Sequence, residues 1–207
     1  TDAHSQYNGT AMNHTIDPDT TAVMYKPVLI RAGIALIFGI TTFFIQDPTD
    51  AVVNYGTAIF LLFSGSAMWE YLRRDPVPEK MRSPLSMIAA IWMLAALTLV
   101  GIQLGGLSGT FTWITIAAGL GLSGIAELWA FTWRKTFAPA RDHLIAGIAA
   151  LVVTVLFIVM EMDYHRIFGI TGTYALIVGV LFGITGPGYW LDTRKAVKED
   201  GYQPPRP

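Results

Sequence analysis

Two ionisable residues stand out because they lie inside long apolar stretches. Arg31 comes four residues after Pro27, and Glu127 comes seven residues before Arg134. At about 1.5 Å per helical residue, both would lie about 6–10 Å inside the same edge of a membrane, where a charge needs a partner or a proton. We predict that Arg31 and Glu127 form an intramembrane ion pair. A proton relay is the alternative, but one acid without others across the midplane makes a poor relay.

The histidines, the absence of cysteine and the absence of the common catalytic motifs indicate no reactive site. A b-type haem needs two axial ligands at similar depth, but His143 and His165 are expected at opposite faces of the membrane. The sequence has no Cys, which excludes disulfides and Cys-ligated clusters. Gly-x-Ser-x-Gly, His-Glu-x-x-His and P-loop signatures do not occur. We therefore expect a protein that is not an enzyme, with no metal and no cofactor.

Small residues recur at the four-residue spacing that lets transmembrane helices pack closely. Such pairs begin at Ala35, Ala117, Ala146 and Gly179. Packing within the protein is the favoured interpretation, and a docking face for another protein is the alternative. The glycines predicted to pack helices together are Gly33, Gly65, Gly124, Gly147 and Gly183.

The elements that must position these residues are apolar helices. The chain has 207 residues, of which 53% are apolar and 14% charged, against about 25% charged in a soluble domain. About 20 apolar residues suffice to span a bilayer as a helix. The predicted spans are 27–45, 52–72, 84–104, 111–133, 144–160 and 167–190. We therefore predict an all-α integral membrane protein with six transmembrane helices.

An internal repeat organises these spans. Small and apolar triplets at 32–34, 89–91 and 146–148 are 57 residues apart. In the even-numbered spans, Gly65, Gly124 and Gly183 are 59 residues apart. Because short loops make each odd span an antiparallel partner of the next, the repeat predicts three tandem helical hairpins that all point the same way.

Lys and Arg predict the orientation. Seven lie in loops 73–83 and 134–143, whereas the three short loops contain only Arg166. Since basic residues are enriched in cytoplasmic loops, we expect both termini to lie in the cytoplasm. The expected location of the protein is a bacterial plasma (inner) membrane. The expected organisation is a polar cytoplasmic tail at 1–25, the six-helix transmembrane bundle at 26–190 and a polar, proline-containing cytoplasmic tail at 191–207.

The segment Gly33-Ile-Ala-Leu-Ile-Phe-Gly39-Ile, the following Asp47-Pro48 and the glycine-bearing second helix with basic residues after it resemble the HdeD family of acid-resistance membrane proteins. The resemblance covers about residues 24–195. It implies an inner-membrane protein of repeated two-helix units with six spans and a link to acid stress. It carries over no catalytic residue, and the two polar tails depart from the family pattern.

Three functions are open from the sequence. The first is a non-catalytic accessory or structural subunit of a larger membrane complex, such as a respiratory or other energy-converting one. Its partners would contact the tails and the lipid-facing helices, because tails of this composition do not fold alone. The second is a stand-alone HdeD-like stress or acid-resistance protein, and the third is a small transporter or channel. We expect membrane lipids as partners but no nucleic acid, since the net charge is −1.

Overall fold

The computed structural model describes residues 18–74, 77–107, 109–135 and 137–199, and this part of the chain is helical without a strand. Its long helices are α1 (Pro18–Phe44), α2 (Asp50–Leu72), α3 (Glu79–Leu104), α4 (Gly109–Phe131), α5 (Asp142–Val159) and α6 (Tyr164–Glu199), with a 3₁₀ turn, η1 (Ala138–Arg141), before α5. All six are long and apolar enough to cross a membrane. The predicted all-α fold with six transmembrane helices is therefore confirmed, and the chain is a multi-pass membrane protein.

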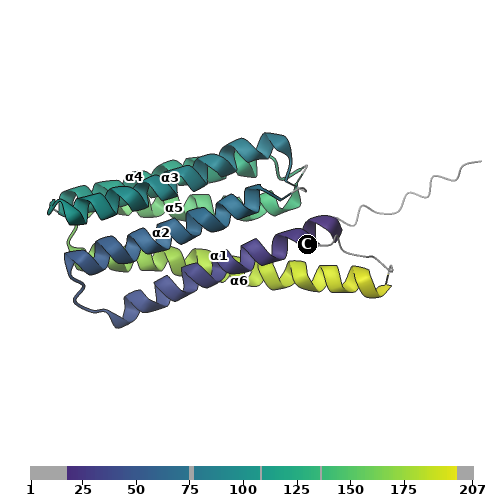
Figure 1. Ribbon diagram of the computed structural model, residues 1–207, viewed down its shortest axis with the longest axis horizontal. Coiled ribbons are helices and arrows are strands. Elements are labelled where there is room, and N and C mark those ends of the chain that lie inside the picture. Colours follow the sequence, from purple (N-terminus) through teal and green to yellow (C-terminus); the bar gives the residue numbers. More distant parts are fainter. Residues whose placement is uncertain (1–17, 75–76, 108, 136, 200–207) are drawn as a thin grey trace, which may run out of the picture.

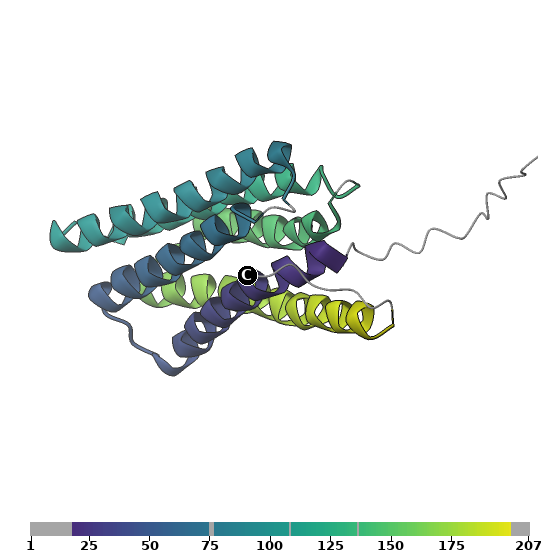
Figure 2. The ribbon, with the colours of Figure 1, turned by 45° about the vertical axis from the view of Figure 1, so that its right-hand side comes forward.

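The helices form a closed ring in which each packs on its neighbours in the sequence and α6 returns to α1. Figure 1 shows α3, α4 and α5 above, α1 and α6 below, and α2 between the two groups. Figure 2 shows α1 and α6 side by side from a second direction. This ring leaves α1 and α4 on opposite sides of a shared interior.

Short loops after α1, α3 and α5 produce the three tandem hairpins that the repeat predicts. The most extensive contacts, however, join neighbouring hairpins: α1 with α6, α2 with α3, and α4 with α5. At one of these contacts, Gly65 on α2 faces the Ala89 carbonyl and the Met93 side chain on α3. Because a glycine lets two backbones approach, α2 and α3 come close together at this contact between hairpins.

Two helices are longer than the sequence predicted. α1 begins at Pro18 rather than at residue 27 and includes Pro27, while α6 continues through Pro187 to Glu199 instead of ending near residue 190. Residues 18–25 and 191–199 therefore belong to the helical bundle and not to polar tails. The remaining parts of both predicted tails, 1–17 and 200–207, lie outside the described residues. The extra turns form because the two helices pack on each other, with Met24 and Ala196 buried.

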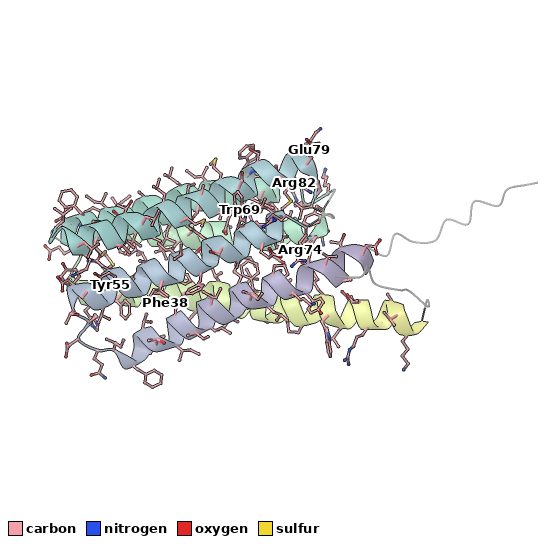
Figure 3. All side chains as sticks on the ribbon, in the orientation of Figure 1. Phe38, Tyr55, Trp69, Arg74, Glu79 and Arg82 are labelled. Atoms are coloured by element: carbon pink, nitrogen blue, oxygen red, sulfur yellow. The ribbon has the colours of Figure 1, made fainter. Side chains whose placement is uncertain are left out.

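The outer surface of the bundle is apolar along its length, and its exposed charged residues lie at the two ends, with the arginines of loop 73–83 at one of them. Figure 3 shows Arg74, Glu79 and Arg82 together at one end of the bundle, whereas Tyr55 lies toward the other. The exposed large apolar side chains include Ile37, Leu94, Ile158 and Ile184. An apolar girdle of this kind is suited to lipid. The cytoplasmic position of the end that carries Arg74 and Arg82 remains a prediction.

Candidate functional site: a buried polar cluster

The structure brings Arg31 and Glu127 together across the interior of the ring. The Arg31 Nη2 atom donates a hydrogen bond to Glu127 Oε1 at 2.6 Å. Arg31 is 5% exposed and Glu127 is fully buried. Since α1 and α4 are not adjacent in the ring, this ion pair joins helices that otherwise make few contacts. A charge pair at this position connects the two sides of the bundle and fixes the axial position of α1 relative to α4.

Two aromatic rings complete the surroundings of the Arg31 guanidinium. Its central carbon lies 4.8 Å from the ring centroid of Trp92 on α3 and 4.3 Å from that of Phe182 on α6. A cation over an aromatic face gains about 0.5–2 kcal/mol, more when both groups are desolvated. Sequence reasoning missed both rings because each lies in an apolar run, where an aromatic residue is ordinary core. The cation is therefore held by one carboxylate and two aromatic rings from three different helices.

Several polar atoms of this cluster have no hydrogen-bond partner among the described residues. They are Arg31 Nε, Glu127 Oε2 and the Tyr174 hydroxyl, and all are buried. Tyr174, on α6, is close enough to interact electrostatically with both members of the ion pair. An unsatisfied buried polar group costs about 1–3 kcal/mol, and ordered water usually satisfies such groups. The cluster is thus polar beyond its single ion pair.

The same end of the bundle contains a second group of ionisable side chains around the start of α5. The Tyr189 hydroxyl donates to Asp142 Oδ2 at 3.0 Å, which joins α6 to α5. His143 is 2% exposed, and its ring lies edge-on to Tyr71 with centroids 6.2 Å apart. The sequence placed His143 at a helix end and excluded it as a haem ligand; the structure shows that it faces the interior. A cavity of about 10 Å³ is lined by Arg31, Tyr71, Asp142 and His143 among others.

A further polar group lies toward the other end of the interior and was missed by sequence reasoning. Asn54 Nδ2 donates to Gln103 Oε1, and Thr112 Oγ1 donates to Asn54 Oδ1, both at 2.8 Å. These bonds join α2, α3 and α4. A signal was available: Asn54, Thr57 and Tyr71 recur at helical spacing inside one apolar span, and all are buried on one face of α2.

The five glycines predicted to pack helices together differ in how closely another helix approaches them. A Cβ added at Gly65 would lie 2.9 Å from Met93 Cγ, and one at either Gly124 or Gly147 would lie 3.0 Å from the backbone oxygen of the other glycine. These three therefore lie at close helix contacts. Gly183 has only an ordinary contact, Leu36 Cδ1 at 3.9 Å from its added Cβ.

Gly33 is a correction to the prediction, because nothing lies within 4 Å of a Cβ added there. The close approaches of α1 and α6 lie on both sides of Gly33 in the chain. At one of them, a Cβ added at Gly186 would lie 2.7 Å from Leu29 Cδ2. A Cβ at Gly39 would lie 2.6 Å from Leu176 Cγ, and one at Gly179 would lie 2.9 Å from the Leu36 backbone nitrogen. Gly33 therefore does not lie on the face of α1 that packs against α6, and the repeat register does not predict which glycines line this contact.

The arrangement is suited to holding helices together and to binding a small polar molecule such as water. Among the described residues, no group of three His, Asp or Glu side chains is placed to hold a metal ion. Comparison of the chain with protein-family models, with curated proteins and with solved structures finds no match.

Proposed function

We propose that this protein is a non-catalytic accessory subunit of a larger complex in the bacterial inner membrane, with both ends in the cytoplasm. The observation that supports this most is the length of α6. Its 36 residues correspond to about 54 Å at 1.5 Å per residue, whereas the hydrocarbon core is about 30 Å thick. Part of α6 therefore stands outside the hydrocarbon, beside the first turns of α1 (Figure 1).

The extension formed by residues 18–25 of α1 and 191–199 of α6 is an ordered, packed pair of helices. Thr193 Oγ1 donates to Thr21 Oγ1 at 2.9 Å, and both side chains are buried between the two helices. On its outer side, Leu191 and Val197 are 57% and 44% exposed. Exposed apolar side chains on an ordered surface beyond the hydrocarbon favour contact with another protein.

The interior supports a structural role over conduction. Trp92, Tyr174 and Phe157 are fully buried large side chains, and the Arg31–Glu127 pair crosses the same interior. Side chains that are packed and paired in this way would have to separate before a solute could pass. A structural subunit, by contrast, needs a bundle that stays closed.

Purification from native membranes in a mild detergent tests the proposal. A tagged chain should co-purify with a partner in a defined stoichiometry. Replacing Leu191 and Val197 together by Ser should lower recovery of that partner. The matched control is Val180→Ser, because Val180 is also exposed on α6, at 52%, but lies in the apolar part of the helix. Equal partner recovery from both variants would exclude the extension as the contact.

The second candidate is a stand-alone stress or acid-resistance protein, which the resemblance of about residues 24–195 to the HdeD family favours. In that case the same purification yields a monodisperse protein without a partner, and cells lacking the chain survive acid challenge less well. Solute flux in liposomes that contain the protein alone would instead indicate a transporter or channel. These three outcomes separate the candidate functions.

A further inference from the structure

A small cavity lies where α1, α2, α5 and α6 meet, next to the buried ion pair. Its volume is about 10 Å³, close to the space that one water molecule requires. Four residues of its lining are polar: Arg31, Tyr71, Asp142 and His143. The others are Pro27, Val28, Ala67, Met68, Pro139 and Phe182. A cavity of this size with several polar neighbours differs from a dry packing defect, which is lined by apolar groups.

Two of the polar residues present atoms that lack a hydrogen-bond partner in the described part of the chain. These atoms are Arg31 Nε and His143 Nδ1. Their side chains are too deeply buried for bulk solvent to supply the missing bonds, at 5% and 2% exposed. A buried water makes two to four hydrogen bonds, and Asp142 and Tyr71 border the same space as further partners.

We propose that this cavity is a binding site for one structural water molecule, which bridges Arg31 Nε and His143 Nδ1. The guanidinium nitrogen can only donate, so the water oxygen accepts from Arg31. The water then donates to His143 Nδ1, with the imidazole proton on Nε2, and its second hydrogen is directed to Asp142. In this way the ion pair between α1 and α4 is extended to α5, and both unpartnered nitrogen atoms are satisfied.

Ala67→Thr and Ala67→Val introduce side chains of nearly the same shape, and their order of stability distinguishes a hydrated cavity from a dry one. Ala67 lines the cavity from α2 and is 7% exposed. In Ala67→Thr the new hydroxyl can replace hydrogen bonds that the displaced water made. In Ala67→Val a methyl group takes the same position and leaves the nitrogen atoms unpartnered. Filling a dry apolar cavity, by contrast, stabilises a protein. If the cavity is dry, the Val variant should therefore be more stable than the Thr variant.

The experiment compares melting temperatures of the Ala67→Thr and Ala67→Val variants in detergent. We expect the Thr variant to melt about 2–12 °C above the Val variant, from the cost of one unsatisfied group and the usual scaling for a chain of this length. Ala117→Thr and Ala117→Val are the matched control, because Ala117 is 6% exposed but does not line the cavity. There the Val variant should melt at least as high as the Thr variant.

Two results would overturn the proposal. One is a Val variant at position 67 that melts as high as the Thr variant or higher. The other is the same Thr preference at Ala117, which would assign the effect to the helix and not to the cavity. If neither Ala67 variant folds, a high-resolution experimental structure of the unmodified protein decides the question. Density for one water within hydrogen-bond distance of Arg31 Nε and His143 Nδ1 would support the site, and a cavity without density would exclude it.

Discussion

Breaking the Arg31–Glu127 pair from either side should destabilise the protein strongly. Arg31→Met removes the cation that pairs with Glu127 at 2.6 Å, and Glu127→Leu removes the carboxylate. Both groups are buried, so each single variant leaves a charged or polar group without its partner. Removing one member of a buried pair typically costs about 3–5 kcal/mol. At about 2–4 °C per kcal/mol for a chain of this length, each single variant should melt about 6–20 °C lower.

The double variant should cost much less than the sum of the two single variants. Replacing a whole buried ion pair by apolar residues of similar volume is often nearly neutral. Here it also loses the contacts of the guanidinium with Trp92 and Phe182, about 0.5–2 kcal/mol each. We therefore expect the double variant to melt close to one single variant and well above the additive value.

The assay is thermal unfolding in a mild detergent, followed by the fluorescence of the six Trp residues. The matched control is Arg74→Met with Glu70→Leu, because this pair also joins an arginine to a glutamate but is 35% and 46% exposed. Exposed pairs contribute about 0–1 kcal/mol, so the control cycle should show almost no coupling. Strict additivity in the Arg31–Glu127 cycle would refute the reasoning.

Further predictions concern helix packing, the second polar group and topology. Gly124→Leu should lower the melting temperature, since overpacking costs about 1–3 kcal/mol and a Cβ there would lie 3.0 Å from a backbone oxygen; Gly33→Leu, with open space, should change it little. Asn54→Leu should destabilise by about 1–3 kcal/mol because it leaves Thr112 without its acceptor, and an unchanged melting curve would count against that bond. A reporter fused at Asp163 should be active on the outer side of the membrane, and a cytoplasmic signal there would contradict the predicted orientation.

Sequence periodicity and composition determined the class of fold and much of its organisation. Apolar runs of about 20 residues have few stable alternatives to a transmembrane helix, because the backbone must satisfy its own hydrogen bonds in lipid. The helical rise of about 1.5 Å per residue then placed Arg31 and Glu127 at similar depths, which was enough to predict that they pair.

The sequence was less informative wherever two distant segments decide the outcome together. Proline and polar residues predicted that the first helix starts at 27, but burial of Met24 against α6 extends it to Pro18. The repeat placed Gly33 at a contact, but the face of α1 that packs on α6 carries Leu29, Leu36 and Gly39 instead. Local propensity is weak compared with the packing of whole helices, so tertiary contacts prevailed at both positions.

The surroundings of the ion pair were also decided by tertiary structure alone. Trp92 and Phe182 reach the Arg31 guanidinium from α3 and α6 only because the ring of helices closes. The cavity beside His143 likewise depends on how four helices meet. Spacing along one helix shows which residues share a face, but which faces meet depends on crossing angles and side-chain volumes in all the helices at once.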